Sequence, residues 1–215
     1  ATNIELSWSF NQGDAKALQG TVSEEGLFSY ATSSLGSDLE FLGTNKAGSL
    51  TVTKVQPKVK ASNNGDGNAI SFSLKTKKGL SLSVKSFSFD ACKLGTNGGS
   101  IDVVAEAGGK SYELLKDESP QNAKNDPYFT HYKADLSQIP ATEGEWVIKV
   151  FVKNVAINKQ YGFANFAIAA TTEGKVEQVN SYSLSASLAD AKAGSIKVSP
   201  TGDIFDEGTS VTLTA

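Results

Sequence analysis

The sequence predicts an all-β protein, an antiparallel β-sandwich followed by part of a second, smaller β module. The main evidence is a repeated alternation of apolar and polar residues, which is the pattern of half-buried strands. Turn-forming sequences separate these runs, and no long stretch keeps the apolar period of an amphipathic helix. The 215 residues include 20 Gly and only 5 Pro, a balance typical of short strands joined by tight turns.

The first expected strand is residues 4–10 (IELSWSF), in which every second side chain is apolar. The same alternation predicts further strands at residues 69–75, 80–84 and 147–153. It places both Trp8 and Trp146 in the core. Turn sequences separate the runs at 63–68, 96–99, 108–109 and 143–144. Short helical turns are compatible with residues 14–18 and 135–139.

Two segments interrupt the alternation. Residues 117–132 (DESPQNAKNDPYFTHY) form a long polar loop that ends in an aromatic cluster, and such loops in compact sandwiches are often functional. Residues 171–180 are polar and free of aromatics, which indicates a domain boundary. We therefore assign residues 1–172 to the sandwich, 173–180 to a linker and 181–215 to a truncated module. Three strands are expected in that module, with turns at 192–194 and 200–202, and too few large apolar side chains for a core.

The composition argues against several classes of function. The net charge is −3 and the chain contains no Arg, the residue best suited to phosphate and guanine contacts, so we expect no nucleic-acid partner. No apolar run is long enough to span a membrane. The only Cys, Cys92, cannot form an internal disulfide, and its apolar neighbours predict a buried, inert thiol. We expect a monomer.

Several motifs occur in an order that resembles a known family. They are WSF, QP, AISFSLKTKKGLSLSVKSFSFD, LGTNGGSIDVV, WVIKVFVKN and KQYGFANFAIAATTEG. Together, over residues 4–174, they resemble the N-terminal non-catalytic domain of secreted pectate lyases and pectin esterases from gut Bacteroidetes. The tail, GSIKVSPTGDIFDEGTSVTLTA, is similar to the start of the bacterial repeat (InlB B-repeat-like) modules of secreted surface proteins.

The resemblance implies a jelly-roll carbohydrate-binding module, with polysaccharide (pectin or another plant cell-wall polymer) as its partner. It also implies a secreted or cell-surface location, and a catalytic domain elsewhere in the parent chain, so this fragment is expected to be no enzyme. The alternative is a structural spacer or adhesin-like module that binds no sugar. Sandwiches of this type often carry a structural calcium ion, to which the sequence assigns no ligands. A departure from the family is that residues 117–132 contain no Arg.

The first candidate site is a set of aromatic side chains, since flat rings pack on the C–H faces of sugars. It comprises Tyr128, Phe129, His131 and Tyr132, together with Tyr161 on a loop before the last strand. The alternative is that Tyr128 and Tyr132 cap the end of the sandwich.

The second candidate site is a sheet face that carries lysines. Alternation places Lys149, Phe151 and Lys153 on one face of their strand, and Ser71, Ser73, Lys75 and Lys77 on one face of another. Lysines on that face could meet the carboxylates of an acidic polysaccharide. The alternative is that they are ordinary solvated lysines.

Catalytic and metal sites have weaker support. Any catalytic Ser-His-Asp or Cys-His arrangement would have to use His131, the single His in the sequence, and the sequence contains no nucleophile elbow. A pair of carboxylates for glycoside hydrolysis stays open, because distant acids can meet in space. Residues 63–68 superficially resemble a calcium loop but lack its spacing, which favours a hairpin turn.

Overall fold

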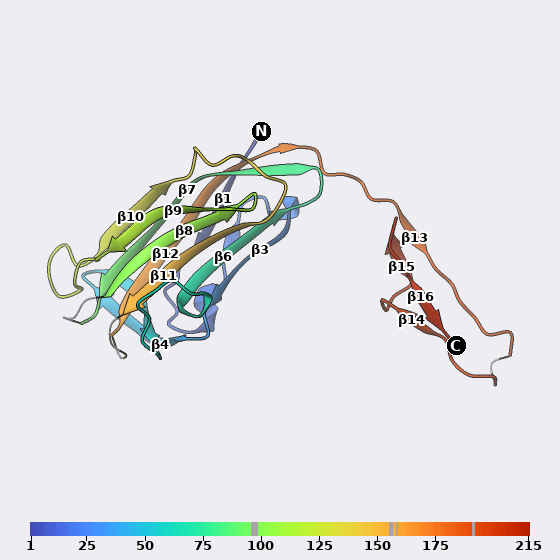
Figure 1. The fold of residues 1–215 in the computed structure, drawn as a ribbon, viewed down its shortest axis with the longest axis horizontal. Helices are drawn as coiled ribbons and strands as arrows, with labels where there is room; N and C mark the ends of the chain where they lie inside the picture. Colours follow the sequence, from blue (N-terminus) through green and yellow to red (C-terminus); the bar gives the residue numbers. More distant parts are fainter. Residues whose placement is uncertain (96–98, 155–156, 158, 191) are drawn as a thin grey trace. The chain divides into compact units, whose positions relative to one another are not determined.

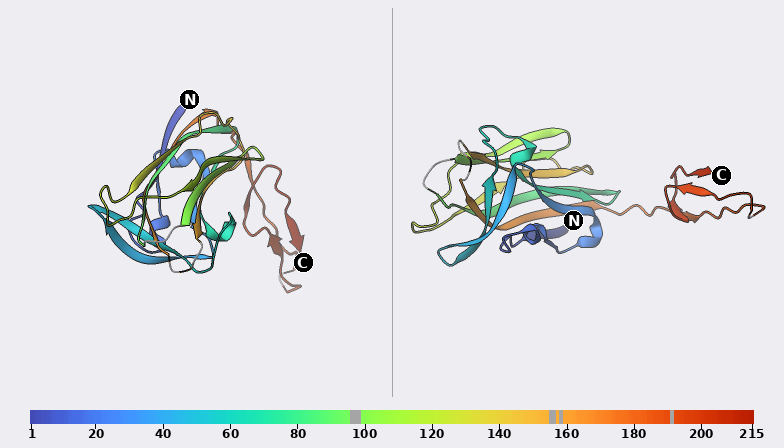
Figure 2. Two further views of the ribbon diagram at one scale, coloured as in Figure 1. Left: turned by 60° about the vertical axis from the view of Figure 1, so that its left-hand side comes forward. Right: turned by 90° about the horizontal axis from the view of Figure 1, so that it is seen from below.

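The computed structural model describes residues 1–215 except 96–98, 155–156, 158 and 191. The chain divides into two units, residues 1–176 and 177–215. The first unit consists of two antiparallel sheets that enclose one large core (Figures 1 and 2). The predicted all-β sandwich is therefore confirmed.

One sheet has seven strands and the other has five. The seven-stranded sheet runs in the order β10 (Thr130–Asp135), β7 (Leu80–Lys93), β12 (Tyr161–Gly174), β1 (Thr2–Trp8) and β2 (Thr21–Val22), and the hairpin of β4 (Leu39–Ala47) and β5 (Leu50–Pro57) joins it at the start of β12. The five-stranded sheet runs in the order β3 (Phe28–Leu35), β6 (Ala69–Thr76), β11 (Trp146–Asn154), β8 (Gly99–Ala107) and β9 (Lys110–Glu118).

The core is built from the apolar half of each alternating strand. Aromatic rings dominate its centre, where Phe166 lies 4.8 Å from Phe72 of the opposite sheet and 5.3 Å from Phe89, measured between ring centroids. Trp8 and Trp146 are both buried, as predicted. The indole Nε1 of Trp146 donates a hydrogen bond to the carbonyl of Leu82 at 3.0 Å, which ties β11 of one sheet to β7 of the other.

The connections between strands differ in part from the sequence expectation. The hairpin expected at residues 63–68 is wrong, because β5 and β6 belong to different sheets and the segment between them crosses from one to the other. It contains the short helix η3 (Asp66–Asn68). The helical turn near residue 14 is confirmed as η1 (Ala15–Leu18), capped by Asp14, and a further turn is η2 (Glu25–Leu27). Residues 96–98 of the expected 96–99 turn lie outside the described residues.

The second unit contains four short strands rather than the three expected. β13 (Ser181–Ser183) pairs with β15 (Ile204–Asp206), and β14 (Lys197–Ser199) pairs with β16 (Thr212–Thr214). None of its described residues is buried, so the paired strands enclose no core. No helix in the described part of the whole chain has the length and apolar character needed to cross a membrane.

Candidate functional site

The outer face of the seven-stranded sheet has small side chains along its middle. Ser88 of β7 is paired with Ala167 of β12 and Lys133 of β10, and Ser86 is paired in the same way with Ala169 and Asp135. All four small residues are half-buried, so this part of the sheet is open to solvent. We call Ser86, Ser88, Ala167 and Ala169 the floor. Outward-facing side chains of the edge strand β10 line one side of it.

A cluster of three polar side chains lies at one end of the floor, and we call Asp90, His131 and Asn165 the polar trio. One carboxylate oxygen of Asp90, Oδ1, lies 2.7 Å from Nδ1 of His131. The other, Oδ2, accepts a hydrogen bond from Nδ2 of Asn165 at 2.9 Å. The Asp90 side chain is only 11% exposed, whereas that of His131 is 58% exposed. The buried carboxylate therefore holds two partly exposed polar groups in place, on the two strands that flank β7.

Asn165 reaches this position through an irregularity in β12. The register with β7 shifts between Ala164 and Ala167, which marks a β-bulge. Asn165 has φ of 55°, a left-handed conformation that Asn tolerates better than most residues. Its backbone N–H donates to the carbonyl of Ser9 at 3.0 Å. The bulge thus directs an amide side chain to the outer face within an otherwise apolar strand.

Beyond the polar trio, the outer face is covered by a small apolar cluster, which we call the end wall. Its buried members are Ala47, Val52, Cys92, Ala123 and Ala164, and Leu50, Leu94 and Phe129 pack against them. Gly162 lies beneath it, and a Cβ at that position would come within 2.5 Å of Val52 and 2.7 Å of the Cys92 sulfur. The β4–β5 hairpin and the loop before β10 therefore close the face at this end. As expected, Cys92 is buried, and burial raises its pKa to about 11.

The structure separates the predicted aromatic site into two groups. Phe129 packs on the end wall, His131 belongs to the polar trio, and the half-exposed Tyr128 lies against Gly48 in the β4–β5 turn. Tyr132 and Tyr161, by contrast, are core residues that are 7% and 1% exposed. Tyr161 begins β12 rather than lying on a loop. Neither ring offers a face to a surface ligand, so we remove both from the candidate site.

The predicted lysine face exists, but its charges are already paired. Nζ of Lys149 lies 2.9 Å from carboxylate oxygens of both Asp66 and Glu106. Nζ of Lys153 lies 3.0 Å from Asp102 and also contacts Asp117. Between the lysines, Phe151 is only 6% exposed. The stripe is therefore closed to a polyanion, because each ammonium group has two carboxylate partners.

These ion pairs change the pKa values of their members. Burial alone would lower the pKa of Lys149 and of Lys153, but the hydrogen bonds to their carboxylates outweigh it and raise both. Burial would likewise raise the pKa of Asp102. Hydrogen bonds from the Asp117 backbone N–H, Lys153 and Asn64 outweigh that effect and lower it.

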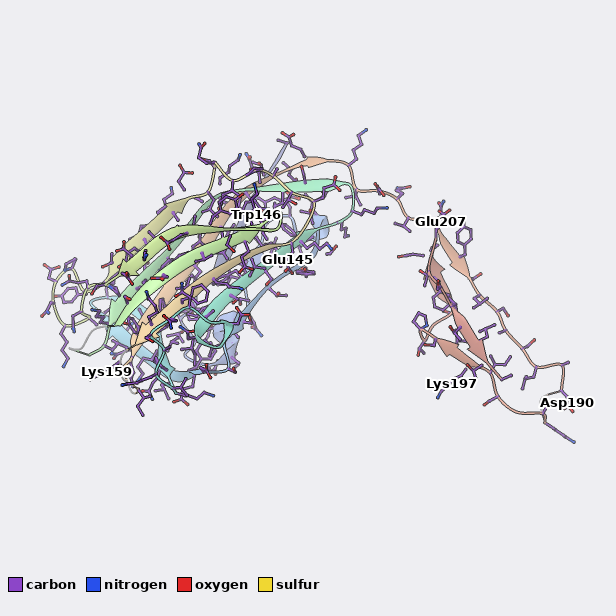
Figure 3. All side chains as sticks on the ribbon, in the orientation of Figure 1. Glu145, Trp146, Lys159, Asp190, Lys197 and Glu207 are labelled. Carbon is purple, nitrogen blue, oxygen red and sulfur yellow. The ribbon has the colours of Figure 1, made fainter. Side chains whose placement is uncertain are left out.

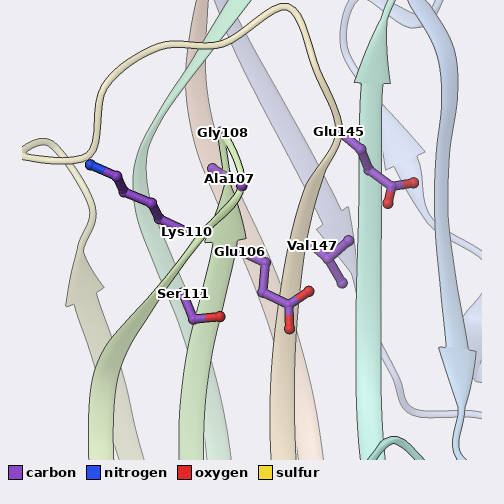
Figure 4. A pocket seen from close by; sticks show the side chains of 8 residues that line it. Glu106, Ala107, Gly108, Lys110, Ser111, Glu145 and Val147 are labelled. Carbon is purple, nitrogen blue, oxygen red and sulfur yellow. The ribbon is translucent and has the colours of Figure 1, made fainter.

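A shallow pocket lies on the outer face of the five-stranded sheet, between the β8–β9 turn and the start of β11 (Figure 4). Figure 3 labels Glu145, the residue directly before β11, on the whole chain. Two carboxylates, those of Glu106 and Glu145, line it. Glu106 is bound to Lys149, and Glu145 accepts a hydrogen bond from the Tyr30 hydroxyl. Glu145 is exposed and Glu106 half-exposed, whereas a general acid in glycoside hydrolysis needs an environment that disfavours ionisation. The pocket therefore lacks the features that distinguish a hydrolase site.

The described residues do not fit a calcium site in the segment before β6. Asp66 binds Lys149, Asn64 donates a hydrogen bond to Asp102, and Asn68 donates to the carbonyl of Val152. Oδ1 of Asp66 accepts from Lys149, Oδ1 of Asn68 accepts from the backbone N–H of Gly65, and Asn64 binds Asp102 through its Nδ2. These side chains are engaged by protein groups and do not form the shared oxygen cage that calcium requires. Nowhere in the described ranges do three His, Cys, Asp or Glu side chains form a group able to hold a metal ion.

The comparisons with known proteins give little beyond this geometry. No family model matches the sequence, and no curated protein matches it significantly. Among solved structures, the CBM22-1 xylan-binding domain of Xyn10C from Paenibacillus barcinonensis is similar, with a TM-score of 0.41 and 11% identity. The match covers 76% of this chain and 92% of that domain. A likeness of this degree carries no conclusion about function, which must come from the site itself.

Two members of the polar trio, Asp90 and Asn165, were missed by the sequence reasoning. Both carry a detectable signal, because each is a polar residue inside an apolar run, SFSFDACKL and FANFAIA. A charged or amide group at such a position requires a partner. The partners themselves lie 41 and 75 residues away from Asp90 in sequence. Only the pairing of β10, β7 and β12 brings them together.

Proposed function

We propose that residues 1–176 form a non-catalytic polysaccharide-binding module that binds its ligand on the outer face of the seven-stranded sheet. The observation that carries the proposal is the polar trio between the open floor and the end wall. Sugar sites combine apolar surface for C–H groups with a few fixed polar groups for hydroxyls. Here Phe129 and the floor alanines supply apolar surface, while His131, Asn165 and the floor serines supply hydrogen-bonding groups.

The geometry does not favour catalysis at this face. Among the described residues, His131 makes no hydrogen bond to a serine, threonine or cysteine hydroxyl or thiol that could act as a nucleophile. Its only hydrogen-bond partner there is Asp90, whose other oxygen is occupied by Asn165. The arrangement holds a ring and an amide still, which suits recognition better than proton transfer.

The ligand class follows from the charges. A pectic or other plant cell-wall polysaccharide is the class that the sequence resemblance implies. The lysines expected to meet galacturonate, Lys149 and Lys153, are paired with carboxylates. The floor is bordered by charges of both signs, from Lys85, Lys133, Asp135 and Glu5, and offers no positive stripe to a polyanion. We therefore place neutral polysaccharides before galacturonan in the proposal.

Affinity electrophoresis and calorimetry against xylan, mixed-linkage β-glucan, arabinan and polygalacturonate test the proposal. Ser88→Leu places a bulky apolar side chain on the floor without charge and is expected to weaken binding at least about tenfold, about 1.4 kcal/mol. The matched control is Ser73→Leu, an outward-facing, half-buried position on β6 of the other sheet. Lys149→Ala should leave the affinity unchanged, because its ammonium group is not available to a ligand.

Two results would overturn the proposal. Absence of binding to all four polymers would favour the structural spacer or adhesin-like module that the sequence leaves as the alternative. Equal loss of binding in the Ser73→Leu and Ser88→Leu proteins would move the site away from this face. A secreted or cell-surface location and a catalytic domain elsewhere in the parent chain are part of the same proposal. They are tested by localising the full-length protein and sequencing its gene.

A further inference from the structure

We infer that this face recognises the end of a glycan chain rather than its interior. The inference rests on the proposed function and specifies which part of the polysaccharide the site accepts. It depends on the position of the polar trio relative to the end wall. Asp90 and Cys92 are two residues apart on the outer side of β7, so the trio lies roughly 7 Å from the wall along the strand.

The end wall blocks the face in the direction of the strands. Val52 of β5 contacts the position of Gly162 on β12, and Ala123 and Phe129 of the loop before β10 pack on the same cluster. Tyr128 joins the two covering segments, since a Cβ on Gly48 in the β4–β5 turn would come within 2.7 Å of its ring. A chain that lies along β7 and β12 would therefore have to stop at this wall.

The other end of the floor stays open. Ser83 and Ser81 continue the outward-facing row of β7, and Thr171 continues that of β12, and all three are half-buried like the floor itself. Within the described part of residues 1–176 this row is open to solvent, with the exposed Lys85 between Ser83 and Ser86, so a glycan could extend along it. One closed end and one open end are the features of a site that takes a terminal residue.

The polar trio lies where that terminal residue would be held. His131 and Asn165 come from the strands on either side of β7, so their backbones are separated by two strand spacings, roughly 10 Å. Both side chains lean inward to the Asp90 carboxylate between them. They therefore form a polar frame for the hydroxyls of one sugar ring, whose apolar edge would lie against Phe129. A terminal residue has one hydroxyl more than an internal residue to engage in such a frame.

Binding stoichiometry distinguishes the two modes. Wild-type protein is titrated calorimetrically with a polysaccharide that it binds, in intact form and after partial hydrolysis to shorter chains. End recognition predicts that the number of sites per gram rises in inverse proportion to chain length. Interior recognition predicts an unchanged number of sites per gram. Borohydride reduction of the chains then separates the two kinds of end, because it destroys the ring only at the reducing end.

Variants test the role of the polar trio and the wall. His131→Ala and Asn165→Gly are each expected to lower affinity at least about tenfold. Gly is chosen at residue 165 because it accepts the left-handed backbone without strain. Phe129→Ala should weaken the preference for chain ends. Lys75→Ala, at an exposed position on the other sheet, is the control, and thermal melts establish that each variant is folded.

The results that would overturn only the inference differ from those that would also overturn the proposed function. If the wild-type protein binds but the sites scale with polymer mass, the inference is wrong while the proposed function stands. If the folded trio variants bind normally, the inference is wrong and the trio no longer supports the proposed function, which then depends on the Ser88→Leu result. If the wild-type protein binds no polysaccharide, both are overturned. A stoichiometry that follows the chain ends, together with weakened binding by the folded trio variants, supports the inference.

Discussion

At the scale of single residues, the two lysines of β11 make similar contacts but differ in what surrounds them. Lys149 binds Glu106 and Asp66, whose side chains are 41% and 87% exposed. Lys153 binds Asp102, whose side chain is only 5% exposed. An exposed carboxylate that loses its partner is rehydrated, whereas a buried one is left uncompensated. Removing the lysine is therefore expected to cost more stability at residue 153 than at residue 149.

We predict that Lys153→Ala destabilises the protein by about 3 kcal/mol, because it leaves the Asp102 carboxylate buried with only its neutral hydrogen-bond partners. Lys149→Ala is the matched control and should cost at most about 1 kcal/mol. Urea unfolding followed by tryptophan fluorescence measures both values. Equal costs for the two substitutions would contradict this explanation.

Asp102 also predicts a dependence of stability on pH. Its folded-state pKa lies below the ordinary value of 3.8, so its contribution is complete above that value and is lost as pH falls through the folded pKa. Asp102→Asn should therefore be less stable than wild type at neutral pH, and the difference should shrink on acidification toward about pH 2. Urea midpoints across this range measure the effect, and a constant difference would refute it.

At the scale of elements, the β4–β5 hairpin covers one end of the seven-stranded sheet, and a glycine makes this possible. Gly162 lets Val52 and Cys92 approach the backbone of β12 more closely than any Cβ would allow. The hairpin in turn buries Cys92, whose raised pKa of about 11 leaves little thiolate at neutral pH. The absence of a side chain at Gly162 therefore explains both the position of the end wall and the low reactivity of the Cys92 thiol.

Gly162→Ala is predicted to push the hairpin outward, lower stability by about 1–3 kcal/mol and speed the reaction of Cys92 with a thiol reagent. Gly26→Ala is the control. No atom lies within 4 Å of its added Cβ, so it should change stability by less than about 0.5 kcal/mol. Thiol labelling at neutral pH, alongside urea unfolding, measures both effects. Unchanged labelling in a Gly162→Ala protein would contradict the proposed packing.

At the scale of the whole molecule, the two units differ in how they are stabilised. Residues 1–176 enclose a continuous aromatic and aliphatic core between two sheets. Residues 177–215 form two isolated strand pairs, and large apolar side chains such as Tyr182, Ile204 and Leu213 are at least half exposed. Two-stranded pairs without a core are marginally stable in water.

Limited proteolysis should therefore cleave within residues 177–215 and leave a resistant fragment of about residues 1–176. Mass spectrometry of the fragments identifies the boundary, and the resistant fragment is expected to keep both the melting temperature and the polysaccharide affinity of the full chain. A protected fragment that contains residues 177–215 would contradict this view.

In the strands with clear alternation, such as β1, β6 and β11, the sequence alone determined which side faces the core, because alternation is a local property of the backbone. It therefore placed Trp8, Trp146 and the apolar positions of β6 and β11 correctly. It did not do so for Tyr132 and Tyr161, which were predicted at the surface and are buried. Tertiary structure decided how the strands pair, and with it whether residues 63–68 form a hairpin or cross between sheets. It also decided that Lys149 and Lys153 meet carboxylates and that Asp90 holds His131 and Asn165. These contacts join residues far apart in the chain, so they depend on strand register, which no local pattern records.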